Sequence, residues 1–416
     1  MSPSDRPVLR GERDQARHVV PAGTVSDRDR YDVIVVGAGI IGLSIAWRAA
    51  QTGCQVLVCD PDPGRGASWA AGGMLAPVAE AGFGEAALTM LALQAARAWP
   101  QFAADLEGAT GRPLHYTTAG TLLVAGDPSD REALDRTLAY HVSLELAAER
   151  LTTRQARLME PLVSPSISGG IMVPGDHHVD NRRVVESLIH AASDAGVIFL
   201  AEEVAAVTHD AGPTSGVRLA DGRQFGSDAV VVAAGSRSGQ IDGVAEADQP
   251  PVRPVRGVTL RLQADGAPQL TRTVRALVHG RSCYFVPRPD GGLVVGATVE
   301  ERGFDLAVPL GGLGDLIADA RRVIPAIDEY ALVEVAPGLR PGTPDNGPIV
   351  GPTHTPGLLL ATGHYRNGVL MAPLTADDVV TTLVGGIAAD GPFANFRPGR
   401  FQSGDPGESK PHKAVG

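Results

Sequence analysis

The stretch YDVIVVGAGIIGLSIAWRAAQTGCQVLVCD, residues 31–60, constrains the fold more than any other part of the chain. Its uncharged part, from Val33 to Trp47, covers only about fifteen residues, whereas a helix that crosses a membrane needs about 20. The pattern instead predicts a β-branched strand at 31–36, a glycine-rich turn at 37–42 and a helix that runs to about Thr52. Gly53 then ends the helix.

The glycines of this turn have the spacing G-x-G-x-x-G, which has a mechanical interpretation. Gly37 permits the tight turn, Gly39 lets a pyrophosphate approach the backbone, and Gly42 lets the helix and strand pack closely. Ile40 and Ile41 lie between these glycines and are expected in the same cofactor-binding turn. The N-terminus of the helix would then face the phosphates.

A second strand and an acid complete the pattern. Residues 55–59 are expected to form this strand, and Asp60 follows it about twenty residues beyond the glycines, where an acid can accept hydrogen bonds from a ribose diol. A bare G-x-G-x-x-G is often only a glycine-rich turn, but strand, helix, second strand and acid in this order predict a dinucleotide-binding unit. The fingerprint alone fits FAD and NAD equally well.

Composition excludes several classes of protein. The chain has 416 residues, of which 44% are hydrophobic, so it is long enough for two domains that enclose a cofactor. A formal charge of −11 argues against nucleic-acid and anionic-membrane partners, which both require clustered positive charge. The three cysteines, Cys54, Cys59 and Cys283, give no disulfide framework, and a cytoplasmic location is expected. No metal site is expected, because the loop histidines His177 and His178 have no third ligand nearby.

Strands and helices alternate along the rest of the chain. Asp180 is expected to cap a helix from 181 to about 195, with strands at 197–200 and 228–235 after it. Two segments, 116–124 and 255–298, instead show the period-two alternation of antiparallel sheet. The last third predicts a buried strand at 358–362, a loop at 363–368 and a helix from Val369 onward. The fold class is therefore α/β, a Rossmann-type domain with an interleaved antiparallel β-sheet domain.

Five passages resemble the FAD-dependent D-amino-acid oxidase superfamily, and within it the glycine oxidases of bacterial thiamine biosynthesis. They are the fingerprint from Gly37 to Asp60, GASWAAGGMLAP at Gly66, CYFVPR at Cys283, GLRPGTPD at Gly338 and GHYRNGVLMAP at Gly363. The resemblance covers roughly residues 31–396. It implies non-covalently bound FAD, because the segment from Ser68 to Met74 matches the loop that lies along the flavin ring in that family.

The resemblance also implies a division into domains and a set of cofactor-binding residues. An FAD-binding domain at 31–114, 172–250 and 336–396 would alternate with a substrate-binding domain at 115–171 and 251–335. An N-terminal arm at 1–30, expected to be disordered, would precede them, and a C-terminal tail at 397–416 would follow. Beyond the fingerprint, the residues expected to bind FAD are Ser68, Ala71, Gly72, Gly73, Met74, Val204, Ala234, Gly235, Gly338, His364, Arg366, Asn367, Gly368, Val369 and Leu370. The amides of residues 368–370 would hold the negative charge that the reduced flavin develops.

Three residues are candidates for the chemistry. A guanidinium binds a carboxylate through two parallel hydrogen bonds, and Arg340 matches the family arginine that does so. Tyr284 matches the family tyrosine whose hydroxyl reaches the same carboxylate, and it should face away from its neighbour Phe285. Arg366 is implied to lie on the substrate side or at the flavin edge. Hydride transfer from Cα to the flavin requires orientation and electrostatics rather than a strong base.

Two pocket positions depart from the family pattern. Val299 stands where a methionine lines the pocket of the best-known glycine oxidases, and Ser282 stands where a histidine precedes the Cys-Tyr pair. The smaller Val299 leaves room for sarcosine or small D-amino acids. The resemblance thus implies oxidation of glycine to an imine, with O2 as acceptor and glyoxylate, ammonia and peroxide as products, and it implies a functional link to a thiazole synthase.

Three alternatives stay open. They are a sarcosine or D-amino-acid oxidase, a dehydrogenase that passes electrons to a membrane quinone, and a non-catalytic redox sensor. The combination of Arg340, Tyr284 and Arg366 favours an enzyme. The oligomeric state, a homo-oligomer included, is also left open by the sequence.

Overall fold

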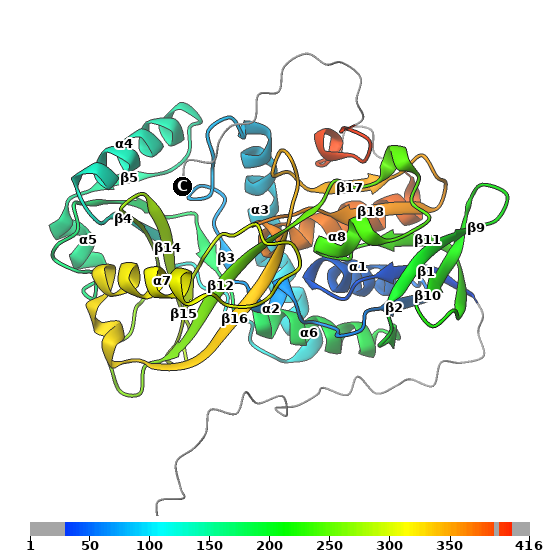
Figure 1. The fold of residues 1–416 in the computed structure, drawn as a ribbon, viewed down its shortest axis with the longest axis horizontal. Helices are drawn as coiled ribbons and strands as arrows, with labels where there is room; N and C mark the ends of the chain where they lie inside the picture. The colour runs from blue at the N-terminus through cyan, green and yellow to red at the C-terminus, as the bar shows by residue number, and fades with distance from the viewer. Residues whose placement is uncertain (1–29, 387–390, 402–416) are drawn as a thin grey trace, which may run out of the picture.

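The structure is a computed structural model that describes residues 30–386 and 391–401. The expected N-terminal arm lies outside these ranges except for Arg30, and so does the tail from residue 402 onward. Two eight-stranded sheets lie side by side, one at the right and one at the left of Figure 1, and a two-stranded piece pairs β3 (Met74–Leu75) with β7 (His177–His178). His177 and His178 were expected in a loop, and this pairing corrects that expectation.

The first sheet is built around a parallel centre. Its strands along the main path are β17 (Ile349–Pro352), β18 (Leu358–Thr362), β11 (Gln224–Val232), β1 (Arg30–Val36), β2 (Val56–Cys59) and β8 (Ile198–Leu200). From β18 to β8 all neighbours are parallel, and β17 is antiparallel to β18. The strand predicted at 228–235 ends at Val232, because Gly235 already begins the 3-10 helix η1 (Gly235–Gln240).

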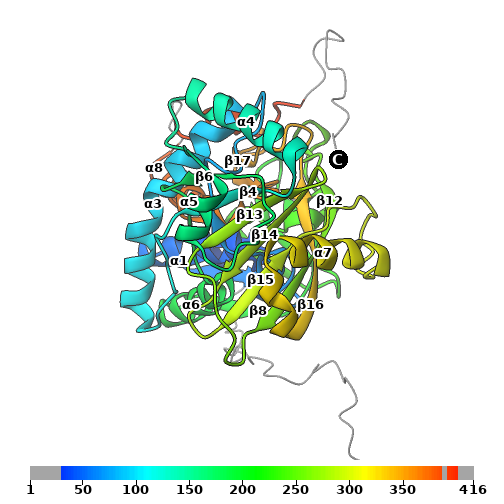
Figure 2. The same cartoon turned by 90° about the vertical axis from the view of Figure 1, so that its left-hand side faces the viewer.

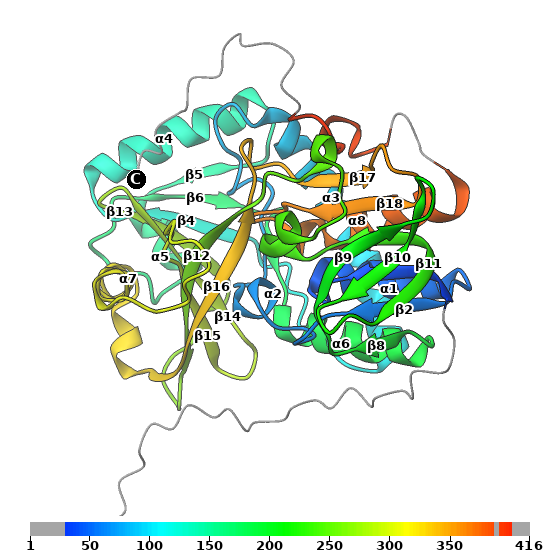
Figure 3. The same ribbon diagram turned by 45° about the vertical axis from the view of Figure 1, so that its right-hand side comes forward.

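Helices cover one face of this sheet and a β-ribbon covers the other. The helices are α1 (Ile40–Gln51), α3 (Ala86–Thr110), α6 (Asn181–Asp194) and α8 (Gly368–Gly385). Alternate residues of β1 divide between the two layers: Val33 and Val35 pack among the helices, and Ile34 and Val36 pack beneath β9 (Val204–His209) and β10 (Thr214–Leu219). Figure 3 brings this ribbon forward. Asp180 caps α6, as the sequence predicts, by accepting the N–H groups of Arg182 and Arg183.

The second sheet is largely antiparallel. Its strands in order are β16 (Ala331–Gly342), β12 (Arg253–Gln263), β15 (Gly292–Gly296), β14 (Arg281–Pro287), β13 (Thr273–Val278), β4 (Thr121–Ala125), β6 (Gly170–Val173) and β5 (Glu149–Leu151). Only the β4–β13 pair is parallel. The domain boundary expected at residue 336 falls inside β16, which pairs with β12 along its whole length.

Short helices pack against the second sheet, which Figure 2 shows from its own side. Residues of α5 (Thr153–Met159) and α7 (Leu310–Val323) share a core with Phe285 and Leu122, and α4 (Pro128–Ser143) packs on the alternate residues Leu123 and Ala125. The helix α2 (Ala67–Ala70) lies between the two sheets (Figures 1 and 3) and contacts β16 and α6. The remaining 3-10 helices are η2 (Glu246–Asp248), η3 (Pro325–Glu329) and η4 (Ala394–Phe396).

One helix of the described residues, α8, is long and apolar enough by length and composition to cross a membrane. More than half of that window, 56%, is buried inside the protein, where α8 packs against α1 and α3. A core helix of a folded domain passes the same test.

Candidate active site

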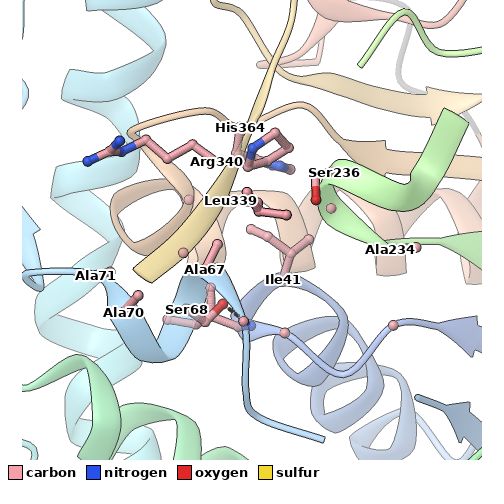
Figure 4. A pocket seen from close by; sticks show the side chains of 18 of the residues that line it. Ile41, Ala67, Ser68, Ala70, Ala71, Ala234, Ser236, Leu339, Arg340 and His364 are labelled. Carbon is pink, nitrogen blue, oxygen red and sulfur yellow. Dashed lines mark hydrogen bonds between the residues drawn. The ribbon is translucent and has the colours of Figure 1, made fainter. Parts of the chain in front are cut away.

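A cavity of about 880 Å³ lies between the two sheets. One side of the cavity is formed by residues at the carboxyl ends of β1, β2, β11 and β18, which is the edge where open α/β sheets bind their ligands. On the other side it is lined by residues of β12, β13, β14 and β16. Figure 4 shows Ile41 of the first side facing Leu339 of β16. Ligands of cofactor size suit a cavity of this volume.

The fingerprint forms one end of the cavity. Gly37 has φ +105°, and a Cβ there would lie 2.5 Å from the carbonyl oxygen of Ala233, so the turn needs glycine. A Cβ on Gly42 would lie 1.9 Å from the oxygen of Gly37, which agrees with its expected role in close packing. Gly39 and the first turn of α1 face the cavity and leave backbone N–H groups available for phosphate.

Asp60 stabilises the glycine-rich turn through hydrogen bonds and also lines the cavity. Its Oδ2 accepts the N–H of Ala38 at 2.7 Å and its Oδ1 accepts the N–H of Asp62 at 2.8 Å. Burial raises the pKa of the Asp60 carboxyl, and the two N–H groups act in the opposite direction. Ser68 fastens the turn from the other side, because its Oγ accepts the N–H of Ile40 at 2.9 Å (Figure 4).

Arg340 and Tyr284 form the other end of the cavity, where glycines make space for both. A Cβ on Gly257 would lie 2.1 Å from Nη1 of Arg340, so the guanidinium rests directly on the β12 backbone. The same Nη1 donates to the carbonyl of Thr298 at 3.2 Å. The Arg340 side chain extends away from the end where Ala234 and Ser236 lie (Figure 4). Desolvation lowers the pKa of Arg340, and Tyr284 opposes that shift.

The Tyr284 ring lies between Gly72 and Gly296. A Cβ on Gly296 would lie 2.3 Å from the Tyr284 hydroxyl, and one on Gly72 would lie 3.3 Å from it. Within residues 30–386 and 391–401 this hydroxyl has no hydrogen-bond partner, and Tyr284 faces the cavity while Phe285 is fully buried on the opposite face. Burial raises the pKa of Tyr284, so the hydroxyl stays protonated and can donate.

The loop before α8 closes the cavity between these two ends. Arg366 lines the cavity, is exposed, and stacks over the Tyr365 ring at 5.0 Å. His364 is buried, its Nε2 lies 3.0 Å from Oγ1 of Thr375, and burial lowers its pKa to about 3, so the ring is neutral. The backbone N–H groups of the first turn of α8 have no capping side chain, and Gly368 and Val369 line the cavity.

Most of the residues expected from the sequence meet in this cavity. The lining includes Ser282, Val299, Ala71, Gly72, Gly73, Met74, Val204, Ala234, Gly235 and Gly338. Gly42, Asn367 and Leu370 do not line it: Gly42 packs under the turn, Asn367 precedes α8, and the Leu370 carbonyl accepts the indole N–H of Trp99 at 2.8 Å. Among the described residues no group of His, Cys, Asp and Glu could hold a metal ion.

Sequence reasoning missed an ion pair in the lining. Nη1 of Arg275 lies 2.6 Å from Oε1 of Glu80, and both side chains are mostly buried at the Tyr284 end. Arg275 is the cross-strand neighbour of Tyr284 in the β13–β14 pair. A period-two reading of residues 273–278 places Arg275 on the same face as Thr273 and Leu277, but nothing local indicates which strand lies beside it.

Known proteins resemble this chain over most of its length. The family model described as FAD dependent oxidoreductase (DAO) matches residues 32–381. The chain belongs to this family. Its members use FAD, and the protein is an FAD-dependent amino-acid oxidase.

The glycine oxidase of Geobacillus kaustophilus is 32% identical over 350 residues, which are 83% of this chain and 91% of that protein. Its crystal structure superposes with a TM-score of 0.82 at 31% identity, covering 89% of this chain and 99% of that one, which confirms the predicted fold class. The bifunctional protein ThiO/ThiG of Synechocystis sp. is 34% identical over 83% of this chain, but the chain spans only 50% of that relative. Hydrogen cyanide synthase subunit HcnC of Pseudomonas aeruginosa is 26% identical over 83% of this chain and 90% of that subunit.

The residues present fit FAD. The N–H groups of Gly39 and Ile41 suit a pyrophosphate, Asp60 suits a ribose, and residues 70–74 line the cavity where a flat ring would lie. When bound, FAD supplies a two-electron acceptor. The chain itself supplies a guanidinium and a hydroxyl that can orient a small anionic substrate, and residues 364–366 also line the cavity.

Proposed function

We propose that this protein oxidises glycine to its imine and passes the two electrons to O2, which gives hydrogen peroxide, and that water hydrolyses the imine to glyoxylate and ammonia. The observation that carries the proposal is the pairing of Arg340 with Tyr284 at the end of the cavity away from the fingerprint. Arg340 would bind the substrate carboxylate through its fork, and the Tyr284 hydroxyl would donate to the same group. The glycine oxidases among its relatives support this assignment.

We propose Arg366 as a substrate-side residue and the first-turn amides of α8 as the site that holds negative charge on the reduced cofactor. Arg366 lines the cavity, and among the described residues no carboxylate lies within 4.0 Å of its guanidinium, so its charge is available to a ligand. The N-terminus of α8 carries a partial positive charge. Both features favour an anionic substrate and an anionic reduced cofactor.

We further propose that the imine supplies a thiazole synthase in thiamine biosynthesis, in a cytoplasmic enzyme. The name ThiO/ThiG of the fused relatives supports the link, and this chain corresponds to half of the Synechocystis protein. The expected domain division, with an FAD-binding and a substrate-binding domain, belongs to the same proposal.

The test is oxygen consumption and peroxide formation with a panel of glycine, sarcosine, D-alanine, a bulky D-amino acid and L-alanine. We expect turnover of glycine and sarcosine, weaker turnover of D-alanine and none of L-alanine. With glycine as substrate, glyoxylate and ammonia should form in equal amounts with peroxide. Cyanide among the products would assign the chain to the chemistry named for HcnC, and dye reduction without peroxide would indicate a dehydrogenase.

A second candidate, an oxidase that prefers sarcosine or small D-amino acids, is favoured by one position. Val299 lines the cavity, is 53% exposed, and is shorter than methionine. The variant Val299→Met fills that space, so we expect it to lower kcat/KM for sarcosine more than for glycine. Equal effects on both substrates would show that Val299 does not set the substrate size.

A further inference from the structure

Side chains bind every backbone carbonyl of the cavity-lining segment from Ser68 to Gly72. Thr259 donates to the carbonyl of Ala70 at 2.9 Å, and Arg288 donates to that of Gly72 at 2.9 Å. Nδ2 of Asn181 donates to the carbonyls of Ser68 and Trp69 at 2.7 and 3.2 Å. Nε of Arg182 donates to the carbonyl of Trp69 at 3.2 Å. Nη2 of Arg261 donates to the carbonyls of Trp69 and Ala71 at 3.1 and 2.8 Å. The donors come from β12, α6 and the end of β14, so the segment is held from outside the cavity.

Arg261 differs from the other two arginines because it has no acidic partner. Arg182 binds Glu334 through two hydrogen bonds of 2.8 and 2.9 Å, and Arg288 lies 3.6 Å from Asp180. Glu334 is the cross-strand neighbour of Arg261 in the β12–β16 pair, yet both of its oxygens go to Arg182. Within the described ranges no carboxylate lies within 4.0 Å of the Arg261 guanidinium.

The Arg261 charge is costly where it stands. Its Nε is buried and has no hydrogen-bond partner in the part of the chain that the structure describes. Burial, together with repulsion from Arg182 and Arg288, lowers its pKa to about 9, so it remains protonated at neutral pH. A buried cation without a counter-ion costs several kcal/mol in general. Arg183 lies 3.7 Å from the same Asp180 oxygen as Arg288, so the cluster of four arginines and two acids carries a surplus of positive charge behind the segment 68–72.

The cavity offers a group that would balance this surplus. The nucleotide end lies at Gly37–Asp60 and the substrate end at Arg340 and Tyr284, and the segment that Arg261 holds lines the cavity between them. FAD bound there would supply a two-electron acceptor. Uptake of a hydride, which is two electrons and one proton, would give the cofactor one net negative charge.

We propose that Arg261 is a positioning residue that holds the loop carbonyls of Trp69 and Ala71 and, through its unpaired charge, raises the reduction potential of the bound FAD. The proposal rests on FAD binding and is independent of which amino acid is the substrate. The loop contacts orient the segment, and the unpaired charge favours the reduced cofactor electrostatically.

The test is the two-electron midpoint potential of the bound FAD, measured by dye equilibration on flavin-replete protein. We expect Arg261→Gln to lower the potential by an amount that equals at least a tenfold shift of the reduction equilibrium, which is about 30 mV for two electrons. The matched control is Thr259→Val, which removes a hydrogen bond to the same segment without changing any charge. An unchanged potential in Arg261→Gln, or an equal fall in Thr259→Val, would overturn the proposal.

A second variant changes the charge of the same cluster in the opposite direction. Its result does not depend on whether Arg261→Gln folds. The Glu334 side chain is 37% exposed. Desolvation raises the pKa of its carboxyl, but the attraction of Arg182 and Arg261 outweighs that effect and the net shift is downward. Glu334 is therefore ionised at neutral pH. Glu334→Gln removes an acid and enlarges the positive surplus, so the potential should rise. A fall or no change in this variant would contradict an electrostatic role for the cluster.

Discussion

At the scale of single residues, the cavity depends on close contacts between large side chains and glycines. We expect Arg340→Ala to lower kcat/KM for glycine by roughly two to three orders of magnitude, because a charge-assisted pair is worth about 1.5 to 3 kcal/mol and an unpaired buried carboxylate costs about 3 to 5. Arg340→Lys should recover only part of the lost kcat/KM, because an ammonium cannot form the two parallel hydrogen bonds of a guanidinium. Tyr284→Phe should lower kcat/KM less than Arg340→Ala does. Steady-state kinetics on flavin-replete protein measure this, and an unchanged KM would move the carboxylate to Arg366.

Gly257→Ala tests the same placement without removing any charge. Its Cβ would lie 2.1 Å from Nη1 of Arg340, so the guanidinium must shift while the cofactor end stays intact. We expect KM for glycine to rise at least tenfold with FAD content unchanged. Gly108→Ala is the matched control, because no atom lies within 4 Å of its added Cβ. Equal kinetics for the two variants would contradict the contact between Gly257 and Arg340 as a determinant of binding.

Asp176 makes the stability of the fold depend on pH. It is fully buried, accepts the N–H groups of Val78 and Ala79 at 3.0 and 2.7 Å, and burial raises its pKa to about 7. Between its unfolded pKa near 4 and about 7, the folded state binds more protons, so this group's contribution to stability falls as pH rises through that window. The decrease is at most about 4 kcal/mol, since one pKa unit corresponds to about 1.4 kcal/mol.

Denaturant midpoints of wild type and Asp176→Asn at pH 5 and pH 8 measure this contribution. Asparagine does not titrate, so the stability of wild type relative to the variant should be greater at pH 5 than at pH 8. A difference that is constant with pH would show that Asp176 is ionised throughout.

At the scale of elements, what the sequence predicts is local. The β1–turn–α1 unit and the Asp180 cap of α6 were predictable, because their signals lie within a few residues of each other. Tyr284 and Arg340 were predicted as site residues because the short motifs that contain them resemble those of the family. Arg275 and Arg261 were missed because their importance depends on cross-strand partners, Tyr284 and Glu334, and strand register is set by tertiary packing.

The β1–turn–α1 unit carries a prediction about Asp60. We expect Asp60→Ala to weaken FAD binding at least tenfold, because it removes the expected ribose acceptor and also frees the N–H groups of Ala38 and Asp62 that shape the turn. Titration of apoprotein with FAD, followed by flavin fluorescence, gives the dissociation constant. Asp32→Ala is the control, since Asp32 accepts the N–H of Gln55 at the amino end of β2, away from the cavity lining. Full FAD retention by Asp60→Ala would show that the acid is not a cofactor contact.

At the scale of the whole molecule, the sheets are separate in their hydrogen bonding but share the cavity. The first sheet supplies the fingerprint end, the second supplies Arg340 and Tyr284, and α2 lies between them (Figure 3). Segments in which strands alternate with helices are interrupted in the sequence by segments with the period-two pattern of antiparallel sheet. This order predicted that two sheets interleave. It could not predict that β16 crosses the expected boundary at residue 336, because an extended segment pairs equally well on either side until its neighbours are known.

This arrangement predicts how FAD affects the stability of the whole chain. A ligand that contacts both sheets must be released before either sheet can unfold, so we expect FAD to raise the Tm of the apoprotein in a single transition. At a free concentration about a thousand times its dissociation constant, FAD should add about 4 kcal/mol to the free energy of unfolding. Differential scanning calorimetry of apoprotein with FAD, with ADP and with riboflavin separates the contributions. ADP would occupy only the fingerprint end and riboflavin only the ring portion, so each should bind more weakly and stabilise less than FAD at the same free concentration. Equal stabilisation by ADP and FAD at the same free concentration would mean that the second sheet does not contact the cofactor, and the assignment of Ala70–Met74 and β16 to the flavin would then be wrong.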